Sequence, residues 1–493
     1  MITDISASKN VLIIGSGIGG LSTAIFLAQL GFQATVIEKN PLAGGLMRGY
    51  TRNGIECAVG IHYLGSLDDG QVLRRLFDCL GVSSEIPVER MGINGVIDRY
   101  IFEDFTFDLP EGLDAYEENL RNGFPGEQRQ ITAIMKTLRE NSEKMHTLDF
   151  LFSTQSDFLM LDGVNPLGET LAELKCSPGL RAVLGVPCCW MGVPPESCPV
   201  YYHDMVLATY LFSSWRLKCS GAEMTNAFAE RLKSLGGKII QGDGVEKILV
   251  NSRIVEGVQL KSGTVLRSPV VIGAVHPKVV LNMLPYDAVK PSYRNRISQL
   301  TDTDGMFSVQ VGVDALSHEE IPYNIFKIHT DKNGDIFDLK YYQLRESEQP
   351  GTNLLTILTS GESEHWQKWE HTMTGRRGRD YSGEKEKRAW RLIRESEEIF
   401  GLLQGVNLFD TYTPLTIRDW VNSPGGSAYG VLRSSSQLLA TALLNRTSVK
   451  GLFLSGQSVM APGVLGTILG SLSTVKLIIG PERFLKMFQS VIQ

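Results

Sequence analysis

The stretch NVLIIGSGIGG, residues 10–20, decides the fold of the N-terminal part of the chain. A β-branched apolar run ends at Gly15, and apolar residues at helical spacing follow from Leu21 to Leu30. Residues 33–37 are predicted to form a second strand. Strand, glycine turn, helix and strand together make a βαβ unit, so the chain is expected to have an α/β fold that begins with a Rossmann-type domain.

The glycine turn also predicts a ligand. Gly15, Gly17 and Gly20, with Gly19 among them, form the pattern G-x-G-x-x-G. In this pattern one glycine makes the tight turn, the next lets the backbone approach a pyrophosphate, and the last lets the helix pack closely on the strand. Glu38 ends the second strand 18 residues after Gly20, where a carboxylate can accept hydrogen bonds from ribose, and Lys39 follows it. We therefore expect a dinucleotide at this turn.

Composition excludes several classes of protein. The 493 residues include 43% hydrophobic and 21% charged residues, which is typical of folded globular domains. The net charge of −6 argues against nucleic acid as a partner. The cysteine count of 7 is odd and no secretory leader opens the chain, so we expect reduced thiols, a cytoplasmic protein and no metal site.

Two segments raise the question of a membrane. Residues 451–475 carry no charge, but their serines, threonines and glycines favour a buried strand, loop and helix over a membrane span. Residues 376–394 are basic, which indicates either a solvated helix face or contact with an anionic membrane surface. Peripheral contact with a membrane is left open, as is the oligomeric state.

The composition and patterning of successive segments predict two interleaved domains. Residues 1–90, 215–290 and 445–493 hold the strand and glycine patterns and are expected to form one discontinuous nucleotide-binding domain. Residues 91–214 and 291–444 are richer in aromatic residues and amphipathic helix patterns, and they are expected to form an inserted α+β substrate-binding domain.

Longer motifs resemble a known superfamily. IEKNPLAGGLMRGY, residues 37–50, resembles the phosphate-side motif of the FAD-dependent amine-oxidase, phytoene-desaturase and carotenoid-isomerase superfamily. Residues 220–248 and 451–471 resemble two further motifs of these proteins. The resemblance implies FAD as the cofactor. It also implies further FAD-binding positions, which are Gly44, Gly45, Leu46, Met47, Arg48, Val245, Gly456, Gln457, Gly463, Val464 and Leu465. At Gln457 many relatives have an acidic residue instead.

One branch of the superfamily is most similar. GIECAVGIHYLG at residues 54–65 and TPLTIRDWVNSPGGSAYG at residues 413–430 are similar to segments of retinol saturases, the all-trans-retinol 13,14-reductases. This resemblance places His62 and Tyr63 near the flavin and Tyr429 on the substrate side. All three have acid–base side chains, so they are candidate catalytic residues.

The resemblance implies an FAD-dependent reductase (saturase) of C=C bonds in a hydrophobic conjugated polyene, such as a retinoid, a carotenoid or a polyunsaturated acyl chain. Isomerase and desaturase activities are near alternatives; a flavin amine oxidase and a non-enzymatic carrier of the GDP-dissociation-inhibitor type are more distant ones. Residues 149–161 and 187–215 are rich in aromatic and aliphatic residues, as a lipid tunnel requires. No second strand-linked G-x-G-x-x-G is present, so NAD(P)H or another electron donor is expected to act only transiently.

Overall fold

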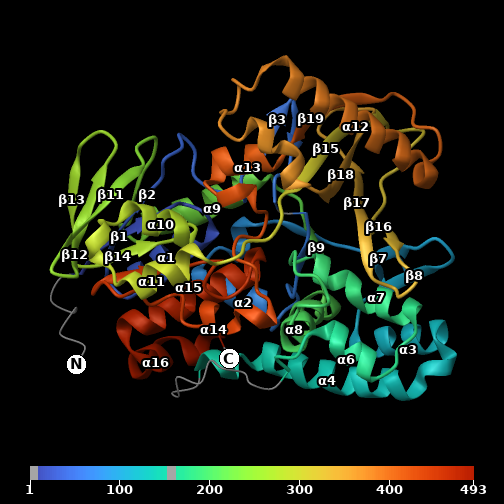
Figure 1. Cartoon of the computed structure of the whole chain (residues 1–493), viewed down its shortest axis with the longest axis horizontal. Helices are drawn as coiled ribbons and strands as arrows, with labels where there is room; N and C mark the ends of the chain where they lie inside the picture. The colour runs from blue at the N-terminus through green and yellow to red at the C-terminus, as the bar shows by residue number, and fades with distance from the viewer. Residues whose placement is uncertain (1–8, 61, 153–162, 493) are drawn as a thin grey trace.

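The computed structural model describes residues 9–60, 62–152 and 163–492. Figure 1 shows three parts: a parallel sheet with its helices on the left, an antiparallel sheet with a long helix at the upper right, and a group of helices at the lower right. The expected fold class, α/β with an inserted α+β part, is confirmed.

The parallel sheet is assembled from distant stretches of the chain. Its strand order is β10-β2-β1-β14-β20, and every pair is parallel. The bounds are β1 Asn10–Ile14, β2 Gln33–Ile37, β10 Lys238–Ile240, β14 Val271–Gly273 and β20 Leu452–Leu454. The central strands are apolar because both of their faces are covered, one by helices and the other by a β meander with two short helices. The predicted βαβ unit is present, with α1 at Ile18–Gln29 between β1 and β2.

Buried hydrogen bonds join the two ends of the chain at this sheet. Helix α15, Gly463–Ile479, lies against α1, and the Ser471 hydroxyl donates to the Gly19 carbonyl at 3.0 Å. The Thr23 and Ser455 hydroxyls are 2.6 Å apart. The uncharged stretch at residues 451–475 is therefore β20, a loop and most of α15, as predicted. Within the described ranges, we find no helix whose length and apolarity would suffice for a bilayer crossing.

Other elements complete this part of the molecule. They are the helices α2 (Val72–Leu80), α9 (Gly221–Ser234), α10 (Pro277–Met283), α11 (Pro291–Ser298), α14 (Leu438–Thr441) and α16 (Pro481–Ile492), and a meander of β11 (Val245–Asn251), β12 (Ile254–Leu260) and β13 (Val265–Arg267). Ile297 and Leu300, which follow the predicted boundary at residue 290, pack in the same apolar cluster as β1 and β14.

The inserted part contains a seven-stranded sheet in the order β19-β15-β18-β17-β16-β7-β8. All its pairs are antiparallel except β16 with β7. The bounds are β7 Val96–Ile101, β8 Thr106–Pro110, β15 Met306–Asp314, β16 Asn324–Thr330, β17 Ile336–Glu346, β18 Thr352–Ser360 and β19 Asn407–Tyr412. Helices α12 (Gly378–Phe400) and α13 (Pro414–Val421) lie beside it (Figure 1).

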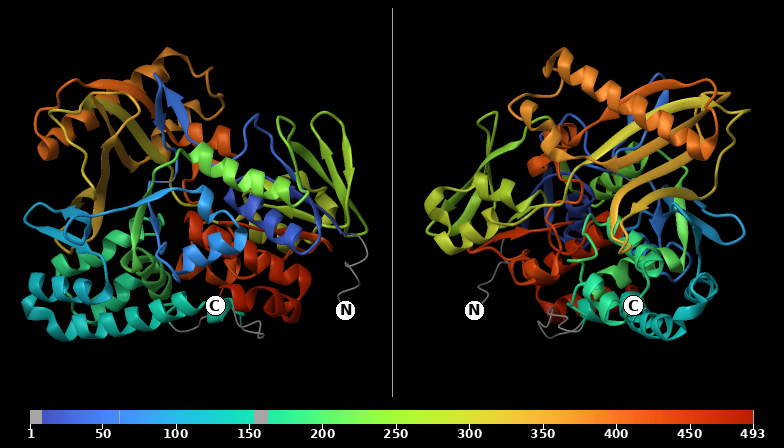
Figure 2. Two further views of the ribbon diagram at one scale, coloured as in Figure 1. Left: turned by 180° about the vertical axis from the view of Figure 1, so that it is seen from behind. Right: turned by 45° about the vertical axis from the view of Figure 1, so that its right-hand side comes forward.

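Helices from the first inserted segment form the third part, opposite the long helix α12 in Figure 2. They are α3 (Leu113–Gly123), α4 (Gln128–Thr147), α5 (Asp149–Phe152), α6 (Leu167–Glu173), α7 (Pro178–Cys189) and α8 (Val200–Phe212). Short strands connect the parts: β3 (Tyr50–Arg52) with β4 (Ile55–Cys57), and β5 (Leu64–Gly65), β9 (Ser214–Leu217) and β6 (Val88–Arg90).

Candidate functional site

The turn between β1 and α1 forms part of the wall of a cavity of 630 Å³, which we call the nucleotide cavity. A Cβ atom added to Gly17 or to Gly463 would meet no atom within 4 Å, so both positions leave open space for a ligand. Gly17 is the N-cap residue of α1 and Gly463 is the first residue of α15, and neither helix has a side-chain cap. Their first N–H groups are therefore available to an anion such as a pyrophosphate. These features fit the expected dinucleotide.

Two other glycines of the motif serve packing. A Cβ atom on Gly20 would lie 2.0 Å from the Gly15 carbonyl oxygen, and one on Gly19 would lie 2.7 Å from the Cα atom of Gly456. Only glycine allows α1 to approach β1 and the loop after β20 this closely. Gly20 consequently lies outside the cavity lining, whereas Gly15, Gly19 and Gly456 belong to it.

Glu38 lines the nucleotide cavity and is 6% exposed. Its Oε2 atom accepts hydrogen bonds from the Ser16 backbone N–H at 3.1 Å and from the Ser16 hydroxyl at 2.6 Å. Its Oε1 atom accepts from the Asn40 N–H at 2.9 Å. These bonds fix the orientation of the carboxylate, and the lone pairs that remain can accept from ribose hydroxyls.

Most of the other predicted FAD-binding residues also line this cavity. They are Lys39, Gly45, Leu46, Met47, Val245, Gln457, Gly463 and Val464. Gly44, Arg48 and Leu465 do not line it. Gly44 packs against Thr225, the Arg48 guanidinium lies 4.9 Å from the centre of the Trp420 ring, and Leu465 lines a second cavity.

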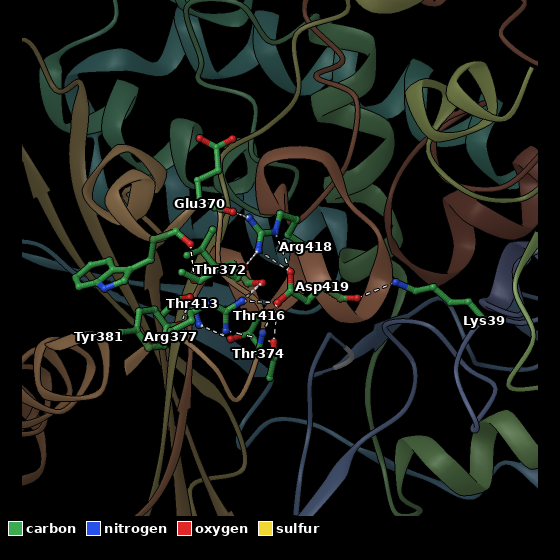
Figure 3. Close-up of polar contacts among 12 residues, drawn as sticks. Lys39, Glu370, Thr372, Thr374, Arg377, Tyr381, Thr413, Thr416, Arg418 and Asp419 are labelled. Carbon is green, nitrogen blue, oxygen red and sulfur yellow. Dashed lines mark hydrogen bonds and ion pairs between the residues drawn. The ribbon is translucent and has the colours of Figure 1, made fainter. Parts of the chain in front are cut away.

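Helix α13 forms another part of the wall of the nucleotide cavity, and Figure 3 shows the polar contacts that hold it in place. Asp419 accepts hydrogen bonds from Arg418 at 2.8 Å, from the Thr374 hydroxyl at 2.8 Å, and from Arg377. Burial raises the pKa of Asp419, but the hydrogen bonds from Arg418 and Thr374 outweigh it, so the pKa is lowered overall. The Lys39 ammonium donates to the Asp419 backbone carbonyl at 2.7 Å. Lys39 therefore ties β2 to α13, which sequence reasoning did not anticipate.

A second cavity of 300 Å³, which we call the aromatic cavity, is lined both by the inserted part and by residues 62–65 and 459–466. Its walls are mostly aromatic and aliphatic side chains, among them Phe150, Trp190, Tyr201, Tyr202, Met205, Tyr210, Phe326, Leu339 and Tyr341. The two cavities share eight wall residues of the described chain, among them His62, Tyr429 and Gly463. Of the predicted tunnel segment at residues 149–161, residues 153–161 lie outside the described ranges.

His62 is placed at this junction as a neutral imidazole. Burial, and secondly the charge of Arg345, lower the pKa of His62 to about 4. Its Nδ1 atom is buried without a hydrogen-bond partner in the described part of the chain. The Gln343 side-chain amide donates to the His62 backbone carbonyl at 3.1 Å. At neutral pH His62 can therefore offer a hydrogen bond but carries no charge.

The two candidate tyrosines occupy different positions. Tyr429 lines both cavities, whereas Tyr63 lines only the aromatic cavity, with its ring centre 4.7 Å from that of Tyr210. Burial raises the pKa of both phenols. Both side chains therefore keep their protons at neutral pH.

Sequence reasoning missed a buried carboxyl group next to this junction. Asp98 in β7 is 0% exposed, and its Oδ1 atom accepts from the Asn324 side-chain amide at 2.8 Å. The Tyr341 hydroxyl donates to the Asn324 amide oxygen at 3.0 Å. Burial raises the pKa of Asp98 to about 7, although the hydrogen bond from Asn324 opposes it. An aspartate in a strand pattern gives no signal for such a role, because only the tertiary fold brings it to the cavity.

Asp98 also faces Tyr63. After burial, the charge of Asp98 is the largest cause that raises the pKa of the Tyr63 phenol. The Tyr63 hydroxyl and the Asp98 Oδ2 atom are both buried, and neither forms a hydrogen bond of standard geometry with the residues that the structure describes. Tyr63 lines the aromatic cavity and Asp98 does not, so Tyr63 stands between the carboxyl group and the cavity.

Sequence reasoning also missed Arg433, the single residue with a permanently charged side chain in the described lining of the aromatic cavity. Across the described ranges no group of three or more His, Cys, Asp or Glu side chains could hold a metal ion. The seven cysteines are all free thiols.

Comparisons with known proteins agree with this geometry. Residues 13–80 match the family model of the NAD(P)-binding Rossmann-like domain. Over 97% of its length the chain is 26% identical to the all-trans-retinol 13,14-reductase of Danio rerio, 87% of which is covered. It is 24% identical over 68% of its length to the 4,4'-diapophytoene desaturase (4,4'-diapolycopene-forming) of Methylomonas sp, with 67% of that protein covered.

The fold is also seen in a crystal structure of an oxidoreductase from Methanosarcina mazei, with a TM-score of 0.68 and 14% identity. The match covers 95% of this chain and 100% of that one. Together these relatives confirm the resemblance to the superfamily and to its retinol-reductase branch.

Proposed function

We propose that this chain is an FAD-dependent oxidoreductase that reduces a C=C bond of a hydrophobic conjugated polyene. The observation that carries the proposal is the junction of the two cavities. A dinucleotide in the nucleotide cavity and an apolar chain in the aromatic cavity would meet at His62, Tyr429 and Gly463.

In this proposal FAD is held mainly by backbone groups. The N-terminus of α1 and the space beside Gly17 would receive the phosphates, and Glu38 would receive the ribose. The N-terminus of α15, at the junction with the aromatic cavity, would face the flavin end. Val245 contributes to the wall at the adenine end, as the sequence resemblance implies. When bound and reduced, FAD supplies the hydride for the chemical step.

The residues of the aromatic cavity then position the substrate and exclude water. Trp190, Tyr210 and Phe326 present rings to the cavity, and such walls bind an extended conjugated chain without charged contacts. Exclusion of water also protects a reduced cofactor and a charged intermediate from side reactions.

Reduction of a C=C bond needs one proton besides the hydride, so that two C–H bonds form as the π bond is lost. We assign this proton to Asp98, which is half protonated near pH 7. It reaches the cavity through the Tyr63 hydroxyl, which takes up the Asp98 proton as it gives up its own. His62 is uncharged at this pH, so in this proposal it helps to position the reacting groups and does not act as a cationic acid.

The relatives support the direction of the reaction and the class of substrate. The relative that is matched over nearly its whole length is named as a reductase of all-trans-retinol. The desaturase relative, which would remove hydrogen, is matched over two thirds of its length. Desaturation is therefore the second candidate. The electron donor is an external one, NAD(P)H or a reduced protein, that visits the flavin transiently.

Peripheral contact with a membrane is part of the proposal. Ala442 and Leu443, just after α14, line the aromatic cavity, and Leu443 is 47% exposed. The neighbouring Leu439 is 79% exposed. An apolar rim of this kind beside a lipid cavity suits uptake of the substrate from a bilayer surface.

Product mass after anaerobic reduction tests the proposed function. The purified protein with bound FAD is reduced without oxygen and mixed with retinol, a carotenoid or a polyunsaturated fatty acid. We expect one of these compounds to reoxidise the flavin and to gain two hydrogens. A loss of two hydrogens by the polyene with oxidised protein would identify the desaturase. An unchanged mass with a changed double-bond geometry would identify an isomerase.

A further inference from the structure

Arg433 is placed where a positive charge is costly. It is the single permanently charged side chain among the described residues that line the aromatic cavity. Burial lowers the pKa of its guanidinium, yet an arginine remains protonated in proteins. A cation in an apolar cavity needs a partner that compensates for its lost hydration.

The protein supplies only part of that compensation. One terminal nitrogen of Arg433 donates to the Thr441 carbonyl at 3.4 Å, and the other donates to the Ser458 carbonyl. Its Nε atom is buried without a partner, and no carboxylate of the described chain forms an ion pair with it. The electrostatic neighbours of Arg433 are the phenols of Tyr201 and Tyr202.

Tyr202 adds a second unused donor at the same place. It is 6% exposed and lines the aromatic cavity, and its hydroxyl has no hydrogen-bond partner in the part of the chain that the structure describes. Burial raises the pKa of this phenol, and the charge of Arg433 opposes that rise. A guanidinium with an unpartnered Nε atom and no counter-ion, beside a hydroxyl that lacks an acceptor, makes a site for an anion.

The single charge sets the class of anion. A carboxylate carries one negative charge and accepts two hydrogen bonds from a guanidinium, whereas a diphosphate would bring further charges that this cavity does not neutralise. An alcohol would leave the charge of Arg433 without a counter-ion. The rest of the lining is largely apolar and aromatic, so it fits a hydrocarbon chain.

We infer that Arg433 and Tyr202 form a carboxylate-binding subsite, so that the substrate is a polyunsaturated acid that binds with its acid group at these two residues. This inference rests on the proposed function, because it assigns one end of the polyene in the same cavity. Thr441, Ala442 and Leu443 line the cavity beside Arg433, which places the acid group close to the apolar rim after α14.

Equilibrium binding to the FAD-loaded protein tests the inference without turnover. The ligands are all-trans-retinoate, its methyl ester, retinol and one polyunsaturated fatty acid, and the readout is quenching of tryptophan fluorescence, to which Trp190 in the cavity wall contributes. We expect retinoate or the fatty acid to bind at least about tenfold more tightly than the ester and the alcohol. Which of the two acids binds more tightly identifies the chain type.

Three variants separate the subsite from general damage. Arg433→Gln should lose about tenfold in affinity for the acid and change affinity for the alcohol less than about twofold. Arg433→Lys, which keeps the charge, should retain part of the preference for the acid. Arg267→Gln removes an exposed arginine outside both cavities and should change neither affinity.

Several results would overturn the inference. Equal binding of acid and alcohol by the unaltered protein would do so. An equal loss of affinity for acid and alcohol in Arg433→Gln would also overturn it. So would a change in flavin absorbance alone, without a change in either affinity, in that variant. If the acid binds through Arg433 but never gains hydrogen, the proposed function fails and the subsite stands. If the alcohol alone is bound and reduced, the subsite fails and the function stands.

Discussion

The two cavities differ in what forms their walls. At its phosphate end, the nucleotide cavity is formed by backbone: the glycine turn and the N-terminus of α1. The aromatic cavity is formed mainly by side chains from α7, α8, α15, β16 and β17 and from loops that are far apart in sequence. Backbone recognition depends on short local motifs, whereas side-chain recognition depends on tertiary packing. A change at one glycine of the turn should therefore abolish binding of the cofactor. A change of one side chain in the aromatic cavity should weaken its function only in part.

The largest effect is expected at Gly17. In Gly17→Leu the new Cβ atom would meet no protein atom within 4 Å and the side chain would occupy the nucleotide cavity, so the protein should fold but lose at least about 100-fold in affinity for FAD. Flavin absorbance per protein after gel filtration measures this. Gly126→Leu, at an exposed position with equal space around its Cβ, is the matched control. Full flavin content in Gly17→Leu would show that the cofactor lies elsewhere.

The next effect is expected at Asp98. Because burial raises its pKa to about 7, Asp98 holds a proton below that pH and loses it above, so the rate of polyene reduction should fall as pH rises through 7. Asp98→Asn should lower the rate about 100-fold and abolish this alkaline limb. Stopped-flow reoxidation of the flavin between pH 5.5 and 8.5 measures both. Asp108→Asn, in the neighbouring strand, is the control, and an unchanged limb in Asp98→Asn would reject Asp98 as the proton source.

The same pKa predicts a change in stability. The folded state holds the Asp98 proton more tightly than the unfolded chain does. The stability that this proton contributes is therefore complete below pH 4 and is lost as pH rises to about 7. Asp98→Asn should remove this part of the pH dependence. Thermal unfolding of both proteins at pH 5 and pH 8 measures the difference.

A smaller effect is expected at His62. Since burial lowers its pKa to about 4, His62 is already neutral across the working range. His62→Gln should therefore reduce the rate by less than about tenfold and leave the pH profile between 5.5 and 8.5 unchanged. Loss of an acidic or alkaline limb in this variant would mean that His62 does titrate during the reaction.

The smallest effect is expected at the rim of the aromatic cavity. Leu439 is 79% exposed and does not line the cavity. Leu439→Ser should weaken binding to phosphatidylcholine–phosphatidylserine vesicles by about twofold to threefold, since one apolar side chain is withdrawn from the bilayer. Reduction of detergent-dispersed substrate should not change. Leu316→Ser, at a 92% exposed position, is the control for flotation assays.

The difference between the cavities also explains what the sequence could predict. The βαβ unit, the glycine turn and Glu38 lie within 29 residues of one another, so their spacing alone indicates the fold and the dinucleotide. His62 and Tyr429 were predicted through the resemblance to a superfamily, because no local rule of spacing or periodicity identifies them. Asp98 and Arg433 gave no signal, because neither belongs to a recognisable motif and the role of each depends on burial that only the assembled fold creates.

Reduction in deuterated water tests the central claim most directly. Protein whose flavin has been reduced without oxygen is mixed with one equivalent of polyene in D₂O. The mass of the product is measured by mass spectrometry after a single turnover. The N–H of a reduced flavin and the protons of Asp98 and Tyr63 exchange with solvent, so we predict that the product gains two deuterium atoms as the flavin is oxidised. A flavin that stays reduced beside a polyene bound in the aromatic cavity would contradict the account.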